Sequence, residues 1–512
     1  MSRPREDTAA RPGTSGEPQA EITVPTLRRL QQRALSLGGA NAFDYATQFL
    51  LPVVLARCLD VLAFGQYRLL WLAVRTVMAI APVAMPGALY YFLPRSQAPA
   101  KRLYINQVLI FLSFTGLLSG WAVSSWNPWL PEAMRSLADY GVVVPAFVIL
   151  WVIASLLDLL PAIEERVLWQ VKVTIGLALL RAIALSVAAA VTGELEPVLM
   201  TLLVFVILKS ALLLGYLARY HGLRGPFLHF GSFREQIKHA APFGGAGALY
   251  DLRAQADQWV VAALFSLEMF ASFSIAALVG TLVALFRKSV KNVFMPSMSR
   301  LQAAGDVAGM LDLNSRANVM VGVLACPLAA FAFAFAEEVV TLVYTAAYID
   351  AAPVMRVYIV GLLPLVVELA SIMLLLRQGT FVMGVNLVAL LVAVPISWIA
   401  AQYFGLSGAA GGTVIAIYLD RVATLHRIAR LTDVPMHRLQ DWRTLGMLTL
   451  IATVAAALAW GIVTHYFSGS GPLLRMASGG LVMIGCYGLL LLLLLGKDRT
   501  GLAAVRNAGG RA

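Results

Sequence analysis

Charge is scarce in this sequence, and its scarcity excludes most soluble classes of protein. Only 13% of the 512 residues are Asp, Glu, Lys or Arg, and 60% are hydrophobic, whereas soluble globular domains carry about 25% charged residues. The mean hydropathy is +0.78. Apolar runs of about 20 residues, the length of a membrane-crossing helix, recur along the chain. Because these runs are continuous and do not alternate as barrel strands do, we expect an all-α polytopic membrane protein.

Cysteine and catalytic or metal-binding patterns are scarce as well. Cys58, Cys326 and Cys486 are odd in number and far apart, which favours neither a disulfide framework nor a thiolate metal site. The sequence contains no HExxH pattern and no GxxxxGK[ST] phosphate loop. We therefore predict no catalytic residue, no metal site and no cofactor, and we exclude ATP hydrolysis of the P-loop kind by this chain.

Fourteen apolar segments are candidate membrane spans. They cover residues 35–57, 66–93, 103–123, 141–160, 167–192, 196–218, 239–265, 269–294, 317–336, 354–376, 380–401, 406–426, 444–466 and 473–495. If the first end is cytoplasmic, 30 of the 39 Lys and Arg residues fall in inside segments, and the outside segments hold only Arg57, Arg135 and Arg475. Because basic residues concentrate in cytoplasmic loops, we expect both termini in the cytoplasm. The net charge of +12 is then explained by basic residues in cytoplasmic loops, and no nucleic-acid partner is predicted.

The chain divides into two similar halves. We expect a mostly disordered cytoplasmic tail over 1–34, six spans over 35–218, a basic cytoplasmic linker over 219–238 and six further spans over 239–430. Residues 431–512 then hold two additional helices and a cytoplasmic tail.

An internal repeat supports this division. At a constant offset of 206, Gly38-Gly39-Ala40 recurs as Gly244-Gly245-Ala246, Phe64 as Phe270 and Tyr67 as Phe273. Such short strings also recur by chance in glycine-rich helical membrane proteins. Both glycine strings, however, open spans that start inside, as a parallel repeat requires. We therefore expect two six-helix bundles related by a parallel repeat, with substrate bound between them near the bilayer midplane.

Several basic residues fall inside the predicted spans, where each costs about 2.5 to 3.5 kcal/mol on insertion scales. Arg68, Trp71 and Arg75 share one helix face at spacings i, i+3 and i+7. A cavity lined by arginine suits a phosphate or carboxylate substrate, because guanidinium pairs bidentately with oxyanions. The candidates for this role are Arg68, Arg75, Arg181 and Arg253.

Other interpretations of the basic residues stay open. Arg68 could extend to the membrane edge, and Arg253 could form an i, i+4 pair with Asp257. For Lys209 and Arg356 we favour a role at a helix end.

Acidic residues in the spans allow two interpretations that the sequence does not separate. They could bind a coupling proton or sodium ion, or they could neutralise neighbouring arginines. The set comprises Asp44, Asp158, Asp251, Asp257 and Glu368. Small residues at Gly116-x-x-x-Gly120 and Gly408-Ala-Ala-Gly411-Gly412 predict close helix packing.

Five strings in the same order carry a family resemblance. They are ARCLDVLAFGQYRLL (56–70), DQWVVAALFSLEMFASFSIAA (257–277), FMPSMSRLQAAGD (294–306), VYTAAYIDAAPVMRVY (343–358) and FGLSGAAGGTVIA (404–416). Together they resemble the polysaccharide-transporter branch of the multidrug, oligosaccharidyl-lipid and polysaccharide exporter superfamily. This branch includes the O-antigen and exopolysaccharide repeat-unit flippases.

The resemblance implies a membrane transporter in the bacterial inner membrane and no enzyme. Two bundles would alternate in access and move a lipid-linked oligosaccharide or polysaccharide repeat unit, carried on undecaprenyl diphosphate, across the bilayer. The four arginines would then bind the diphosphate. Membrane lipids and the lipid-linked glycan are the implied partners, and a glycan polymerase and a chain-length regulator stay open.

Three alternatives compete with this interpretation. A cation-coupled multidrug antiporter would need anionic cavity residues for basic drugs, which the excess of arginine disfavours. A lipid II flippase is a closely related alternative. A membrane-embedded glycan polymerase would be expected to present paired acidic groups on a sizeable outside loop, and the longest outside segments, near 124–140 and 337–353, show no such pair.

Overall fold

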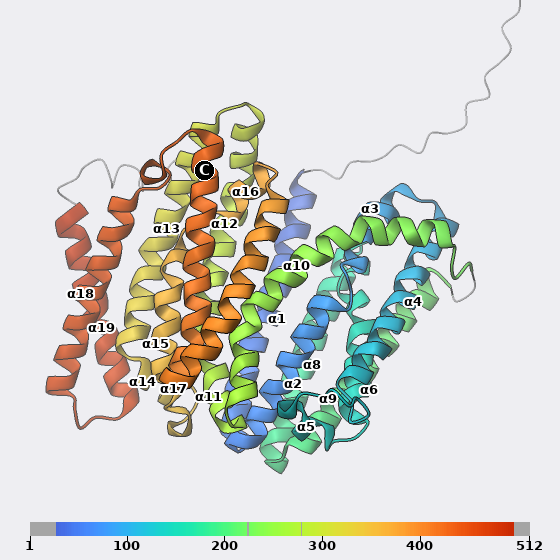
Figure 1. Cartoon of the computed structure of the whole chain (residues 1–512), viewed down its shortest axis with the longest axis horizontal. Helices are drawn as coiled ribbons and strands as arrows, with labels where there is room; N and C mark the ends of the chain where they lie inside the picture. The colour runs from blue at the N-terminus through green and yellow to red at the C-terminus, as the bar shows by residue number, and fades with distance from the viewer. Residues whose placement is uncertain (1–26, 223–224, 278, 496–512) are drawn as a thin grey trace, which may run out of the picture.

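Helices make up the regular structure of residues 27–222, 225–277 and 279–495, which the computed structural model describes (Figure 1). Each of the fourteen predicted spans coincides with a helix, part of a helix or a chain of short helices, so the all-α fold is confirmed. By length and apolar composition, 8 helices of this part of the chain can cross a membrane, or 9 if α2 and α3 form one span.

The first six spans form one bundle. Its helices are α1 (Leu27–Cys58), α2 (Val61–Ile80) with α3 (Met85–Phe92) and η1 (Leu93–Arg95), α4 (Ala98–Ala122), α6 (Val143–Ala154) with η2 (Ser155–Asp158) and α7 (Leu160–Ile163), α8 (Val167–Thr192) and α9 (Leu195–Tyr220). The short helix α5 (Glu132–Ala138) lies in the loop between α4 and α6.

The next six spans form a second bundle beside the first (Figure 1). Its helices are α10 (Phe230–Leu264), α11 (Leu267–Ala276), α12 (Val279–Ala303), α13 (Val307–Ala334), α14 (Ala336–Val343), η3 (Ala346–Tyr348), α15 (Ala351–Leu362), η4 (Pro364–Val366), α16 (Ala370–Leu375) and α17 (Gly379–Thr432). After η5 (Met436–Arg438), the last pair, α18 (Trp442–Tyr466) and α19 (Pro472–Leu495), packs on the outer side of this bundle (Figure 1).

The structure differs from the predicted spans in two ways. Helix α1 begins at Leu27, inside the segment 1–34 expected to be a tail, because residues 27–36 lack Pro and Gly and are rich in helix formers such as Leu, Arg, Gln and Ala. Residues 1–26 lie outside the described part of the chain. The second, fourth, eighth and tenth spans, predicted as continuous, are each broken into shorter helices.

Close helix packing occurs where the sequence places small residues, as predicted. A Cβ atom at Gly116 would lie 3.2 Å from the Ile149 carbonyl oxygen of α6. In α17 the backbone turns at Gly405, whose φ is 59° and ψ −144°. The two arms of α17 then pack so tightly that a Cβ at Gly412 would lie 2.1 Å from the Ser397 hydroxyl oxygen. The eleventh and twelfth spans are therefore one helical hairpin.

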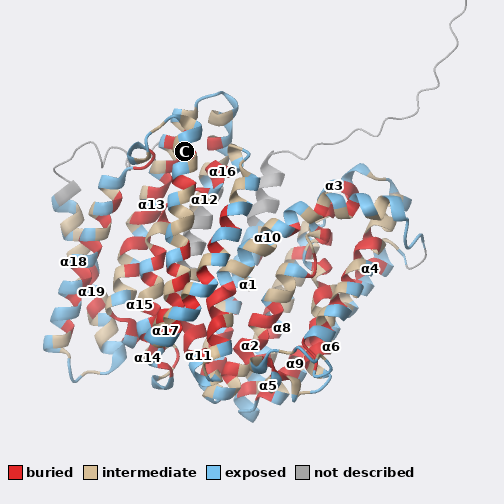
Figure 2. Cartoon of the chain, viewed as in Figure 1, coloured by how far each residue is buried: buried red, intermediate tan, exposed pale blue. Residues whose placement is uncertain are grey.

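The surface of the protein is apolar on its outward faces. Figure 2 shows that buried residues gather along the faces where helices pack on one another. Many exposed residues are large and hydrophobic, such as Phe114, Val191 and Leu481, with 65%, 79% and 74% of their surface exposed. Exposed apolar faces of this extent fit a lipid environment.

The internal repeat is visible where the bundles meet. The Asp60 carboxylate accepts a hydrogen bond from the Ala63 amide at the start of α2, and the Ser266 hydroxyl accepts one from the Met269 amide at the start of α11. These capping pairs are 206 residues apart, the offset found in the sequence. Helices α2 and α11 pack directly on each other, as equivalent elements do across a twofold axis. The two bundles related by a parallel repeat are therefore confirmed.

Candidate functional site

Arg68 joins the two bundles. Its Nε donates to the Ser274 hydroxyl at 2.9 Å and its Nη2 donates to the Ser274 carbonyl at 3.2 Å. Ser274 lies on α11 at the repeat offset from Arg68, and the arginine is 5% exposed. Arg68 therefore does not extend to the membrane edge, and its contact with Ser274 uses two of the five N–H donors of the guanidinium.

Arg75 lies two turns further along α2 and is exposed. Next to it, the Thr76 hydroxyl donates to the Gln255 side-chain oxygen at 3.1 Å and accepts from the Trp259 indole at 2.9 Å. Both partners lie on α10, so polar side chains join α2 to α10 beside Arg75. Sequence reasoning missed this threonine–glutamine–tryptophan contact, since no local pattern marks it.

Arg253 lies on α10 two residues before Gln255. Its Cζ is 5.6 Å from the centroid of the Tyr250 ring, and its buried Nε has no hydrogen-bond partner. Within the described residues no ion pair joins Arg253 to Asp257, so the i, i+4 pair that the sequence left open does not form. Because Asp257 instead accepts from Tyr358, Arg253 keeps its donors available.

A polar cavity of about 130 Å³ lies inside the first bundle, among α1, α6, α8 and α9. Arg181 pairs with Asp44 at 2.9 Å, and Lys209 pairs with Asp158 at 2.8 Å. The Lys209 ammonium also lies 5.0 Å from the Trp151 ring centroid. Lys209 is in the middle of α9, so the predicted helix-end role is wrong. An apolar span that carries a single central lysine was the signal that could have revealed this cavity.

The acidic candidates differ sharply in their partners. Asp44 and Asp158 face the cations of this cavity, and Glu368 lies 3.6 Å from the Lys291 ammonium. Asp251 is exposed on α10. Asp257 is 1% exposed and has no ion-pair partner among the described residues.

The Asp257 carboxylate is held by uncharged groups of the second bundle. The Tyr358 hydroxyl of α15 donates to Oδ2 at 2.7 Å, and the Gln258 amide donates to Oδ1 at 2.8 Å. The Thr413 hydroxyl of α17 approaches the same carboxyl but has no hydrogen-bond partner. A buried carboxylate among hydroxyls is the donor set that a hard cation or a proton requires.

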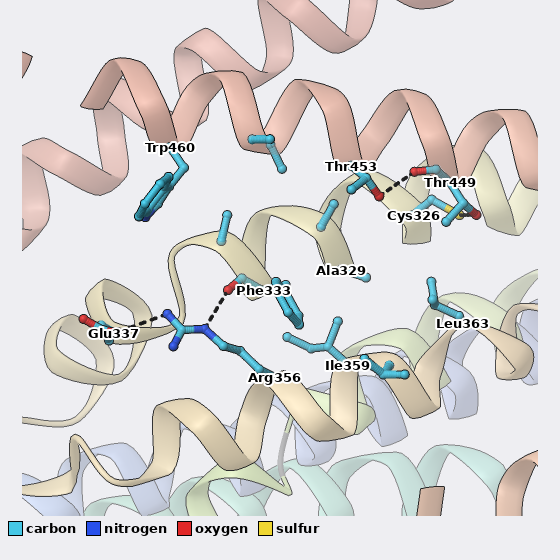
Figure 3. Close-up of a pocket in the computed structure, with 15 residues that line it drawn as sticks. Cys326, Ala329, Phe333, Glu337, Arg356, Ile359, Leu363, Thr449, Thr453 and Trp460 are labelled. Carbon is cyan, nitrogen blue, oxygen red and sulfur yellow. Dashed lines mark hydrogen bonds and ion pairs between the residues drawn. The ribbon is translucent and has the colours of Figure 1, made fainter. Parts of the chain in front are cut away.

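An apolar pocket of about 650 Å³ lies between α13, α15 and α18 (Figure 3). At one end Arg356 donates to the Phe333 carbonyl at 3.2 Å and pairs with Glu337 at 3.1 Å. Phe333 is in the last turn of α13, whereas Arg356 itself lies in the middle of α15, so the predicted helix-end role of Arg356 is wrong for its own helix. The volume lies in the range of ligand pockets, about 300–1,000 Å³. Sequence reasoning missed this pocket because its walls come from three distant segments.

Comparisons with known proteins agree with this architecture. The family model described as "Polysaccharide biosynthesis protein" matches residues 54–353, which is more than half of the chain. No curated protein matches the sequence.

Among solved structures, the chain is similar to the lipid II flippase MurJ in an inward closed conformation, with a TM-score of 0.69 and 13% identity over 90% of this chain and 99% of that one. It is also similar to an inward-facing multidrug resistance transporter of the MATE family, with a TM-score of 0.59 and 12% identity over 77% of this chain and 96% of that one.

A Vibrio cholerae MATE transporter is similar at a TM-score of 0.51 and 12% identity, over 80% of this chain and 98% of that one. These likenesses show a shared fold. The chain thus belongs to the polysaccharide biosynthesis protein family and has the fold of the exporter superfamily that includes MurJ and the MATE transporters.

Proposed function

We propose that this protein is a flippase that moves a lipid-linked oligosaccharide or polysaccharide repeat unit, carried on undecaprenyl diphosphate, across the bacterial inner membrane by alternating access. The observation that carries the proposal is the pair of arginines at the contact of the two bundles. Arg75 is exposed without an ion-pair partner among the described residues, and Arg253 holds an unpartnered, buried Nε. A diphosphate is the ligand that such guanidinium groups suit best.

The four candidate arginines take different roles in this proposal. Arg75 and Arg253 bind the diphosphate directly. Arg181 contributes when its contact with Asp44 opens, and Arg68 positions α2 against α11 through Ser274. The family membership supports a glycan substrate, and the apolar pocket between α13, α15 and α18 supports a lipid one, since its lining offers contacts to a hydrocarbon chain.

Asp257 is our proposed coupling group. The other buried or half-buried acids of the spans already face Arg or Lys, so they balance charge. A multidrug antiporter remains the second candidate, because Asp257 is a buried carboxylate that a basic drug could pair with. It is the weaker candidate, because the site offers only one carboxylate for a basic drug but two arginines, Arg75 and Arg253, for an anionic substrate.

The experiment is lipid analysis of a deletion strain. Without the protein, undecaprenyl-diphosphate-linked repeat units should accumulate on the cytoplasmic leaflet, and wild type should clear them. Arg75→Ala and Arg253→Ala should each slow clearance about 10- to 100-fold, since a hydrogen bond to a charged group contributes about 1.5–3 kcal/mol.

The matched control is Arg316→Ala, which removes an exposed arginine paired with Asp312 on α13. It should clear the intermediate at the wild-type rate. Normal lipid intermediates together with lost drug resistance would contradict the flippase in favour of an antiporter. Normal intermediates with altered polymer length would favour a polymerase or an accessory role beside one.

A further inference from the structure

The cavity of the first bundle contains two ion pairs whose members differ in exposure. The side chains of Arg181 and Lys209 are 9% and 7% exposed, whereas those of Asp44 and Asp158 are 29% and 58% exposed. The cations therefore belong to the wall of the cavity, and the carboxylates reach it from the open side.

This asymmetry determines which partner can be exchanged. A buried cation without a counter-ion is costly, so Arg181 and Lys209 need an anion at all times. An exposed carboxylate loses little when it returns to water. An incoming oxyanion can consequently take the place of Asp158 or Asp44 while the cation stays where it is.

A third residue of the cavity wall lacks a partner. Gln170 on α8 is 4% exposed, and its amide nitrogen donates to the Asp158 carbonyl and the Thr174 hydroxyl, both at 3.3 Å. Its side-chain oxygen is buried and accepts no hydrogen bond. An unsatisfied buried acceptor calls for a donor, and a hydroxyl group supplies one.

The cavity also has a defined size and neighbourhood. Its volume of about 130 Å³ is well below the about 300–1,000 Å³ of pockets that enclose a whole drug-sized ligand, so it admits one acidic group with its adjoining hydroxyls and not a whole repeat unit. Trp151 of the cavity wall packs against Trp71 at 5.2 Å between ring centroids, and Trp71 lies one turn before Arg75 on α2. The cavity is therefore near the proposed diphosphate site.

We propose that this cavity is an anion-exchange site for an acidic sugar of the lipid-linked glycan. Asp158 and Asp44 neutralise Lys209 and Arg181 in the empty protein. The sugar carboxylate displaces one of them, and a sugar hydroxyl donates to Gln170. This inference rests on the proposed function and deepens it, because it makes the first bundle selective for glycans that carry a carboxylate near the diphosphate.

Binding of glucuronate to the full-length protein in lipid nanodiscs tests the proposal, with glucose as the neutral control. Asp158→Asn removes the competing carboxylate and should tighten glucuronate binding about tenfold. Asp44→Asn is an independent variant that frees Arg181 and should act in the same direction. Lys209→Gln should abolish binding. Asp312→Asn, which removes the partner of the exposed Arg316 on α13, should leave the affinity unchanged.

Unchanged or weaker glucuronate binding in both Asp158→Asn and Asp44→Asn would overturn the proposal and leave the ion pairs with a structural role. Equal competition by inorganic phosphate would overturn its sugar specificity. Transport of the lipid-linked glycan in proteoliposomes separates this inference from the proposed function. If wild type transports but the variants bind no tighter, the exchange site fails and the flippase stands. If the wild-type protein does not transport the lipid-linked glycan, the proposed flippase function is wrong, whatever the result of the glucuronate-binding experiment.

Discussion

A single buried carboxylate carries the expectation of ion coupling. Asp257 is 1% exposed and hydrogen-bonded by Tyr358, and no cation of the described residues pairs with it. We expect Asp257→Asn to abolish the stimulation of transport by a proton or sodium gradient in proteoliposomes, because the amide can neither bind a proton nor balance a cation. Asp251→Asn, on the exposed face of the same helix, should keep the stimulation. Gradient-driven transport by Asp257→Asn would refute the assignment.

The spacing of residues along the sequence predicts which side chains share a helix face, but not which residues of other helices they contact. The spacing of Arg68, Trp71 and Arg75 correctly placed them on one helix face. Arg68 is buried, Trp71 packs against Trp151 at 5.2 Å between ring centroids, and Arg75 is exposed. The spacing could not show that Arg68 meets Ser274, because that partner is 206 residues away. The i, i+4 spacing of Arg253 and Asp257 allows an ion pair geometrically. In the structure the Asp257 carboxylate instead accepts a hydrogen bond from the Tyr358 hydroxyl of α15.

At the scale of single elements, the α17 hairpin offers two adjacent glycines with opposite surroundings. A Cβ at Gly412 would lie 2.1 Å from the Ser397 hydroxyl oxygen and 2.8 Å from the Ala393 carbonyl oxygen, whereas one at Gly411 would meet no atom within 4 Å. We expect Gly412→Ala to destabilise the protein by about 1–3 kcal/mol through overpacking. Gly411→Ala should be neutral or stabilising by up to about 1 kcal/mol, because alanine favours helix.

Thermal unfolding in detergent measures both variants side by side. Equal shifts in melting temperature would show that the two arms of α17 do not pack as described.

Apolar length predicted the position of the spans, and proline accounts for the breaks in the second, fourth and tenth of them. The second span was predicted as continuous over 66–93, but α2 ends at Ile80, just before Pro82, and Val83 and Ala84 adopt positive φ angles of 45° and 54°. Proline has no backbone N–H and so cannot donate the next hydrogen bond of the preceding helix, although the residue before it, such as Ala81, is still helical in φ and ψ. A hydropathy window averages over such a break. The same reasoning applies to Pro161 at the start of α7 and Pro364 at the start of η4.

The whole molecule is built from two copies of one plan, and the repeat offset in the sequence contained that information. How the copies meet is a matter of long-range packing that local patterns do not encode. Arg57, at the end of α1, donates to the carbonyl groups of Leu342 and Val343 at the end of α14, and Phe64 lies edge-on to Tyr348 at 5.6 Å. These contacts join the bundles at the end that the positive-inside pattern assigns to the periplasm. Alternating access requires that they separate.

Gly65 is the position from which this separation can be tested. A Cβ there would lie 2.3 Å from the Leu267 carbonyl oxygen, a backbone atom that can move only if α11 moves away from α2. We expect Gly65→Ala to push the bundles apart at this end and to shift the population toward the outward-open state.

The reporter is Ala271→Cys, at a fully buried position on α11, in a background in which Ser replaces the three native cysteines. A membrane-impermeant maleimide added from the periplasmic side should label it several-fold faster in Gly65→Ala than in the parent. Gly87→Ala on α3, where a Cβ meets nothing within 4 Å, should leave the labelling rate unchanged. If Gly65→Ala labels no faster than this control, the contact between α2 and α11 is not the outer gate.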